Sequence, residues 1–144
     1  MKDARVPRLY VAAALESQAR LVLPEDAAHH AARVLRLREG DLVLLVDGRG
    51  GEHEARLSFP ARGRVTADIG VRRDVERESP LAVTLLQGVS SGEKMDFTIQ
   101  KAVELGVAAI QPILAAKSVV RLSAEREAKK LAHWKRIAIA ACEQ

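Results

Sequence analysis

The chain has 144 residues, of which 48% are hydrophobic, 29% charged and only 3% aromatic. No apolar run approaches the ~20 residues of a membrane-spanning helix, and a single cysteine, Cys142, excludes an intramolecular disulfide. The net charge of +4 permits a nucleic-acid partner without requiring one, and the scarcity of aromatic residues argues against base stacking as the binding mode. We expect a cytoplasmic protein, because the opening sequence MKDARVPRLY has no apolar core of a secretory signal.

The first half of the chain has the pattern of a mostly β module. Short strands are predicted over residues 8–11 and 19–23, and a helix over 24–37. A proline and two acidic residues suit the start of this helix, arginines suit its end, and Gly40 is the expected stop.

The clearest hairpin follows, over residues 41–59. An apolar run leads into Asp47-Gly48 and two further glycines, after which alternation of polar and apolar residues resumes. Another strand is predicted over 62–71. We therefore predict a small β-barrel-like domain over residues 1–74, followed by a charged linker over 75–80 that a proline closes.

The second half follows a different pattern. Residues 81–89 form a nearly continuous apolar run, typical of a strand that is buried on both faces. A helix is predicted over 90–106, with Ser90 and Glu93 as a capping box and Gly106 as its stop. Its expected apolar face consists of Met95, Ile99, Ala102 and Val103.

A second strand over 108–114 and a second helix over 123–144, with Ser123 as N-cap, complete the pattern. The apolar positions of this helix are Leu131, Trp134, Ile137, Ala138 and Ala141. The order strand–helix–strand–helix is the opening of a parallel α/β sheet. A sheet usually has about 4–6 strands, so we expect residues 81–144 to be only part of a domain. The overall class is α+β.

Several motifs, in order along nearly the whole chain, resemble the RsmE family of 16S ribosomal RNA (uracil-N3)-methyltransferases in the SPOUT superfamily. In the second half they are Gly92-Glu93-Lys94-Met95-Asp96, Gln100-Lys101-Ala102, Glu104-Leu105-Gly106-Val107, Pro112, Ser118-Val119-Val120, Trp134 and Glu143-Gln144. In the first half they are His30, Val34-Leu35-Arg36, Gly40-Asp41 and Asp47-Gly48, which are similar to the family's PUA-like RNA-binding domain.

The resemblance implies a PUA-like domain followed by the first part of a knotted SPOUT methyltransferase domain. It further implies S-adenosylmethionine as methyl donor, 16S rRNA or the small ribosomal subunit as partner, and a homodimer formed through the SPOUT domain. The family's glycine-rich cofactor loops and trefoil knot have no counterpart in these 144 residues. We therefore expect no residue of this chain to bind the cofactor, and no activity of the chain alone.

The resemblance places Arg33, Arg36 and Arg38 on an RNA-facing surface, where they would contact phosphates. The alternative is that they are solvated charges beside Glu39 and Asp41. The neighbouring histidine pair at positions 29 and 30 lacks a supporting cluster of cysteines or carboxylates, so we expect no metal site.

The resemblance also makes Lys101 and Glu104 candidate catalytic residues, although on the residues alone they form an exposed ion pair of the predicted helix. Ligands of open α/β sheets gather at the carboxyl ends of the strands. This rule makes Lys94, Ser118 and Arg121 further RNA-binding candidates. Cys142 is interpreted as a small helix residue and not as a nucleophile.

Two other interpretations stay open. The chain could be a non-catalytic RNA-binding or ribosome-assembly module, or a structural α/β protein whose resemblance is only ancestral. In the complete enzyme that it resembles, the methyl group would be displaced directly onto N3 of a uridine after loss of the N3 proton. The family chemistry then depends on orientation and on a general base, which the sequence does not identify.

Overall fold

The computed structural model describes residues 6–75, 79–116 and 123–143. They form two compact units, Met1–Glu76 and Arg77–Cys142, called here the N-terminal and the C-terminal unit. The N-terminal unit contains β1 (Arg8–Tyr10), β2 (Arg20–Val22), α1 (Glu25–His29), the π-helix η1 (His30–Val34), β3 (Leu42–Val46), β4 (Glu52–Ala61) and β5 (Arg64–Arg73). The C-terminal unit contains β6 (Thr84–Gly88), α2 (Gly92–Glu104), β7 (Ala109–Ile113) and α3 (Ala124–Cys142).

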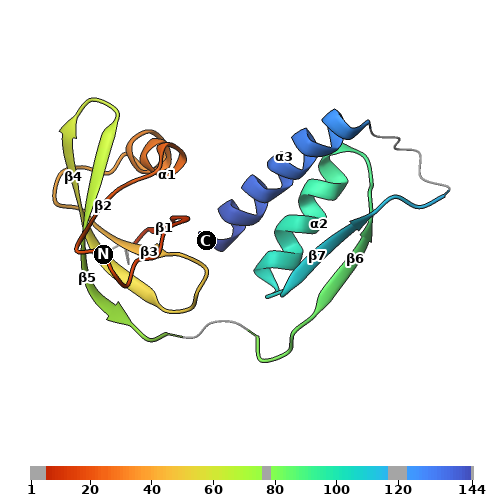
Figure 1. Ribbon diagram of the computed structural model, residues 1–144, viewed down its shortest axis with the longest axis horizontal. Coiled ribbons are helices and arrows are strands. Elements are labelled where there is room, and N and C mark those ends of the chain that lie inside the picture. The colour runs from red at the N-terminus through yellow and green to blue at the C-terminus, as the bar shows by residue number, and fades with distance from the viewer. Residues whose placement is uncertain (1–5, 76–78, 117–122, 144) are drawn as a thin grey trace, which may run out of the picture. The chain divides into compact units, whose positions relative to one another are not determined.

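The N-terminal unit is one five-stranded sheet in the order β1-β3-β4-β5-β2. Only the β1–β3 pair is parallel, and the long β4–β5 hairpin has register shifts that let the strands bend (Figure 1). The predicted strands and the hairpin between β3 and β4 are thus confirmed. The core consists of Leu9, Val11, Leu15, Leu23, Ala27, Ala28, Ala31, Val43, Leu45, Ala55, Leu57, Val65 and Ala67.

The predicted helix over 24–37 is shorter and less regular than expected. The α-helical turns end at His29, and the next turns are a π-helix in which the Leu35 amide donates to the His30 carbonyl over 2.9 Å. The segment then ends at Arg36, which has a φ of 55°. Gly40, with a φ of 81°, lies in the following turn and does not stop the helix. The sequence pattern missed this end because an arginine holds a conformation that usually calls for glycine.

The C-terminal unit has the predicted order strand–helix–strand–helix, and β6 and β7 pair in parallel. The expectation that residues 81–89 are buried on both faces is wrong: exposed and half-buried residues alternate in β6, and Leu86 is 64% exposed. The reason is that α2 and α3 lie on the same side of this two-stranded sheet (Figure 1). The core of the unit is Val89, Met95, Ile99 and Trp134.

The two ends of α2 differ from each other in how well the sequence predicted them. Ser91 and not Ser90 precedes the helix, with no side-chain cap bond, so the predicted capping box is wrong. The C-terminal end is as predicted: Gly106 has a φ of 79°. The Gly106 amide donates to the Val103 carbonyl and the Val107 amide to the Ala102 carbonyl, which is a Schellman motif.

In α3, the buried Trp134 and Ala141 agree with the predicted apolar positions, whereas Leu131 is 46% exposed. The Ser123 carbonyl accepts the Glu127 amide over 2.9 Å at the start of this helix. Within the described part of the chain, no helix has the length and hydropathy that would let it cross a membrane.

Candidate functional site

Three exposed arginines follow one another where η1 passes into the next turn. Arg33 lies on the π-helix, Arg36 two residues after its end, and Arg38 at the beginning of the turn that leads to β3. Among the described residues, none of these three guanidinium groups has an ion-pair partner. Unpaired arginines at a surface are free to form bidentate hydrogen bonds with phosphate oxygens.

The acidic residues beside these arginines are bound elsewhere. The Glu39 carboxylate accepts the backbone amide of Phe59 over 2.7 Å, and the Asp41 carboxylate accepts the backbone amide of Arg38 over 2.7 Å. Both carboxylates therefore fix the backbone of the turn and form no ion pair with a neighbouring guanidinium group.

The β3–β4 hairpin adds a fourth arginine to the same place. Arg56 pairs with Leu42 in the strand register, and its Nη1 donates to the Gly40 carbonyl over 3.1 Å. Sequence analysis missed Arg56, although the predicted hairpin already placed it opposite the start of β3. We call Arg33, Arg36, Arg38 and Arg56 the arginine surface.

Some other arginines of the N-terminal unit form ion pairs with carboxylates. Arg8 pairs with Glu52, Arg20 with Asp68, and Arg73 with Glu54. The hydrogen bond from Arg20 lowers the pKa of the Asp68 carboxyl group, and the same bond raises the pKa of Arg20. Arg62 and Arg64, by contrast, are exposed and have no ion-pair partner among the described residues, as in the arginine surface.

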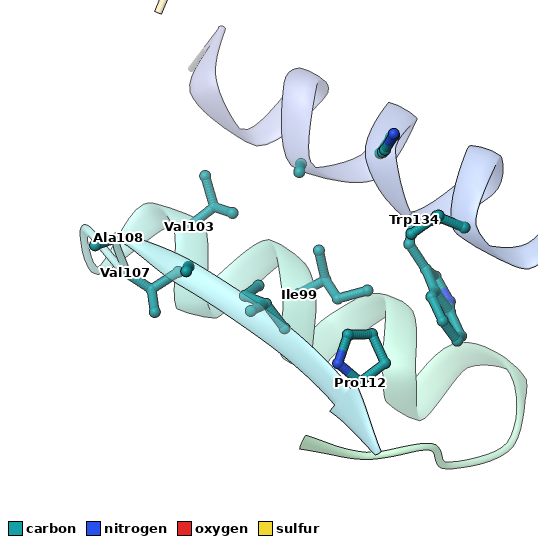
Figure 2. A pocket seen from close by; sticks show the side chains of 11 residues that line it. Ile99, Val103, Val107, Ala108, Pro112 and Trp134 are labelled. Atoms are coloured by element: carbon teal, nitrogen blue, oxygen red, sulfur yellow. The ribbon is translucent and has the colours of Figure 1, made fainter. Parts of the chain in front are cut away.

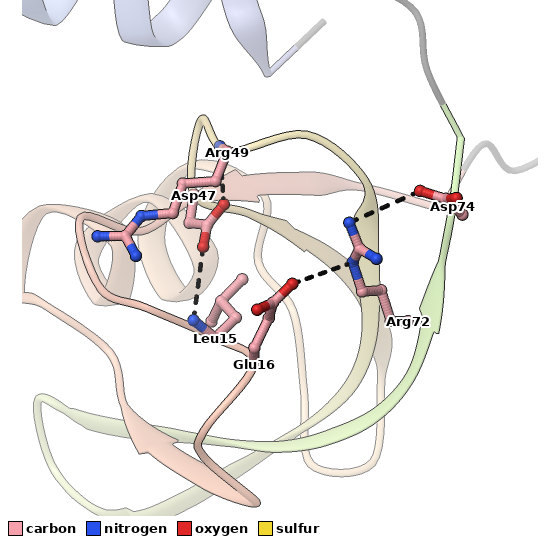
Figure 3. Close-up of polar contacts among 6 residues, drawn as sticks. All are labelled: Leu15, Glu16, Asp47, Arg49, Arg72 and Asp74. Carbon is pink, nitrogen blue, oxygen red and sulfur yellow. Dashed lines mark hydrogen bonds and ion pairs between the residues drawn. The ribbon is translucent and has the colours of Figure 1, made fainter.

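Arg72 is bound on two sides, as Figure 3 shows. Its guanidinium lies 3.6 Å from the carboxylate of Glu16 and 3.6 Å from that of Asp74. Nearby, Asp47 accepts the Arg49 amide over 2.9 Å and thereby holds the turn, while the Arg49 side chain points away from it (Figure 3). Arg49 is exposed and is a further cation that sequence analysis did not select.

The candidates of the C-terminal unit do not lie together. Lys94 is in the first turn of α2, next to the carboxyl end of β6, whereas Lys101 and Glu104 are in its last turns. At 1.5 Å per residue, seven residues separate Lys94 from Lys101 by about 10 Å along the axis. The Lys101 Nζ lies 2.6 Å from the Glu104 carboxylate, so the ion pair expected from spacing alone is present. Ser118 and Arg121 lie outside the described residues.

A pocket of about 290 Å³ opens between α2, β7 and α3 (Figure 2). Ile99, Val103 and Trp134 contribute to an apolar lining in which Lys135 is the charged residue. S-adenosylmethionine carries ribose hydroxyls, an amino group and a carboxylate, and the pocket offers no carboxylate for the hydroxyls or the amino group. A Cβ added to Gly88 or Gly92, beside the carboxyl end of β6, would meet no atom within 4 Å, so neither glycine forms a tight cradle for a ligand. The lining of this pocket does not fit the cofactor.

Metal binding has no basis in the part of the chain that the structure describes. No group of three or more histidine, cysteine, aspartate or glutamate side chains is close enough there to hold an ion. His29 is exposed on α1 and belongs to no such group.

The two units correspond to two known domain families. Residues 23–70 match the RNA methyltransferase PUA domain, and residues 77–144 match the RNA methyltransferase domain. The chain therefore has the domain order of a PUA domain followed by residues of an RNA methyltransferase domain. More specifically, the chain belongs to the ribosomal RNA small subunit methyltransferase E family, RsmE.

Relatives and solved structures support this membership. The chain is 34% identical over 119 residues to the ribosomal RNA small subunit methyltransferase E of Bacillus subtilis, covering 83% of this chain and 46% of that protein. The Neisseria gonorrhoeae enzyme of the same name, solved with S-adenosyl methionine, is 45% identical with a TM-score of 0.90, over 96% of this chain and 57% of the other. A Legionella pneumophila methyltransferase solved with the same cofactor is 36% identical with a TM-score of 0.93, over 97% and 58%. The chain thus spans about half the length of these relatives.

Proposed function

We propose that these residues form the RNA-binding part of an enzyme that methylates N3 of a uridine in 16S ribosomal RNA, in the cytoplasm, with S-adenosylmethionine as donor. We infer the substrate, ribosomal RNA of the small subunit, from the names of the relatives. The N-terminal unit holds the RNA by its phosphates, which positions it without reading the sequence.

One observation supports RNA binding above all others: the arginine surface is unpaired although acidic residues adjoin it. Glu39 and Asp41 are engaged by backbone amides, so their charges do not occupy the guanidinium groups. In the same unit, Arg8, Arg20, Arg72 and Arg73 are paired with carboxylates, whereas Arg49, Arg62 and Arg64 are exposed and have no ion-pair partner among the described residues. A surface that keeps four arginines exposed together is suited to a polyanion.

The backbone at Arg36 supports the same proposal. Its φ of 55° is a conformation that costs a residue with a side chain roughly 1–2 kcal/mol and costs glycine almost nothing. The Leu37 amide donates to the Ala31 carbonyl over 2.9 Å, so the turn itself is a helix end of the kind that glycine usually occupies. An arginine at this position therefore lowers stability, which is understandable if its side chain binds a ligand.

The Arg36→Gly substitution tests this proposal directly. We expect it to raise the free energy of unfolding by about 1 kcal/mol and to weaken binding of a 16S rRNA fragment. The slope of log affinity against log salt concentration should become shallower by about one, the change expected when one phosphate contact is lost. Fluorescence anisotropy across a salt series and urea unfolding measure the two effects.

Arg36→Ala is the matched control, because it removes the same side chain and keeps the backbone strain. It should weaken RNA binding as much as the glycine variant does, without the gain in stability. Unchanged affinity in both variants would exclude Arg36 from the RNA contact. Unchanged affinity after replacing all four arginines of the arginine surface would refute the proposed binding surface.

Catalytic roles for Lys101 and Glu104 remain part of the proposal, and the contacts limit them. Their ion pair lies toward the end of α2 that is remote from the carboxyl end of β6. They would have to act together with residues beyond the described part of the C-terminal unit. Ser118 and Arg121 stay proposed RNA contacts, as does Lys94, which is exposed at the opposite end of the helix.

The apolar pocket between α2, β7 and α3 favours a second candidate function, an RNA-binding or ribosome-assembly module without catalysis. Its lining does not fit the cofactor, and we propose that these 144 residues alone neither bind S-adenosylmethionine nor transfer a methyl group. Calorimetric titration with the cofactor and a methyl-transfer assay on 16S rRNA test this; saturable binding would overturn it. We also propose homodimerisation through the C-terminal unit, which sedimentation equilibrium measures.

A further inference from the structure

Phe97, on α2, is the most exposed aromatic side chain of the described residues. It leaves 62% of its surface exposed, whereas Trp134 is 8% exposed and both Tyr10 and Phe59 are partly buried. An exposed aromatic ring offers a flat apolar surface to a partner. The question is what kind of partner its surroundings fit.

Two lysines flank Phe97 on the same face of α2, where the exposed Glu93 and Glu104 also lie. Lys94 precedes it by three residues and Lys101 follows it by four, the spacing at which helical side chains become neighbours. The Lys101 Nζ lies 5.8 Å from the centre of the ring. The buried Met95 and Ile99 point to the other side, into the core of the unit. We call Lys94, Phe97 and Lys101 the lysine–phenylalanine strip.

An aromatic ring between two cations fits a single-stranded nucleic acid better than an apolar protein surface. A base stacks on the ring while the adjoining phosphates contact the ammonium groups. An apolar partner would instead have to remove the lysines from water, which is costly without compensating partners. Double-stranded RNA does not fit, because its bases are stacked inside the helix and are not available to the ring.

The charges of the strip also indicate which lysine contributes more. Lys101 already contacts Glu104 at 2.6 Å, and that carboxylate repels a phosphate. Lys94 is exposed, has no ion-pair partner among the described residues, and lies in the first turn of α2, where the helix dipole adds positive potential. The phosphate of the stacked nucleotide is therefore expected beside Lys94.

We propose that the lysine–phenylalanine strip binds an unpaired RNA nucleotide by stacking its base on Phe97. The inference rests on the proposed RNA binding and adds a second contact, on the C-terminal unit, that distinguishes single-stranded from double-stranded RNA. The low aromatic content of the chain does not oppose it, because one exposed ring is sufficient for one base.

The test uses the 144-residue chain and labelled RNA of about 12 nucleotides, within the usual size range of a single-strand binding site, as a single strand and as a duplex. Phe97→Ala and Phe97→Leu should each weaken single-strand binding about tenfold, with little effect on the duplex. Phe97→Trp should retain the affinity, and its indole fluorescence should be quenched on binding while the buried Trp134 stays constant. Lys94→Ala should weaken binding more than Lys101→Ala.

Leu86→Ala is the control, because Leu86 is 64% exposed on β6, a different element of the same unit. It should bind as the unchanged chain does, and thermal unfolding should show that every variant is folded.

If the chain binds RNA and Phe97→Ala binds equally well, the stacking proposal fails while RNA binding through the arginine surface stands. If Phe97→Leu retains full affinity, the contact is apolar and not stacking. If the unchanged chain binds neither RNA, both proposals fail. Loss of a dimer in Phe97→Ala with unchanged RNA affinity would assign the ring to a second copy of the chain.

Discussion

The N-terminal and C-terminal units bury their apolar side chains in different ways. Five strands with register shifts enclose a core of thirteen buried residues in the first unit. In the second, two parallel strands and two helices enclose a core of only four. Leu86, Phe97 and Leu105 each remain more than half exposed there.

This difference shows that the side chains of an apolar segment are not necessarily buried. The run over residues 81–89 is as apolar as a central strand. Within it, the residues of β6 alternate between exposed and half-buried because helices cover one side of the sheet. In β3, by contrast, three consecutive residues are buried, so both faces of that strand are covered. We expect the two units to respond differently to the same kind of substitution.

The largest expected effect is in the N-terminal core. Leu45 is fully buried among the thirteen core residues, so Leu45→Ala should lower the free energy of unfolding of this unit by about 2–5 kcal/mol. Hydrogen exchange in β3, β4 and β5 measures the loss. Exchange that stays slow in these strands would show that the core tolerates the cavity and would weaken the contrast between the units.

A matched substitution in the C-terminal core should cost less. Ile99 is 3% exposed but also lines the pocket of about 290 Å³, so Ile99→Ala enlarges an existing space that water can enter. We expect a loss of about 2 kcal/mol, near the lower end for such changes. Urea unfolding followed by the fluorescence of Trp134, which packs in the same core, measures it. A loss larger than that of Leu45→Ala would reverse the comparison.

The helix end at Gly106 gives a smaller, local effect in the C-terminal unit. Its φ of 79° disfavours a side chain, and an added Cβ would lie 3.4 Å from the Ser79 Cβ. Gly106→Ala should therefore lower stability by about 1 kcal/mol, read from thermal unfolding. Gly88→Ala is the control, because an added Cβ there meets nothing within 4 Å and no left-handed φ is required. Equal losses in the two variants would argue against backbone strain as the cause.

The smallest effect concerns pH and the N-terminal unit alone. Because Arg20 lowers the pKa of the exposed Asp68 below the ordinary value of about 3.9, the folded state binds that proton more weakly than the unfolded state. The contribution is present above the ordinary pKa and is lost as the pH falls through the lowered one. Thermal unfolding between about pH 5 and pH 2 should show a slightly weaker acid dependence in Asp68→Asn. An identical pH profile would mean that solvent screens the pair completely.

Much of the arginine surface could be predicted from the sequence, and the missing part has a physical reason. Arg33, Arg36 and Arg38 are close along the chain, so a local motif includes all three. Arg56 joins them only through the β3–β4 register, which the hairpin turn sets. The exposure of Phe97 could not be predicted, because helical periodicity places it opposite the core without showing whether anything covers it.

The sequence by itself determined the order of the elements, the hairpin at Asp47, the helix end at Gly106 and the family. These features depend on local conformational preferences and on motifs that are contiguous in the chain. Only the tertiary structure decided that Glu39 and Asp41 serve backbone amides, that Arg36 ends a π-helix in a left-handed conformation, and that β6 is half exposed. Each of these depends on which groups compete for the same partner in space, and residue spacing alone does not contain that information.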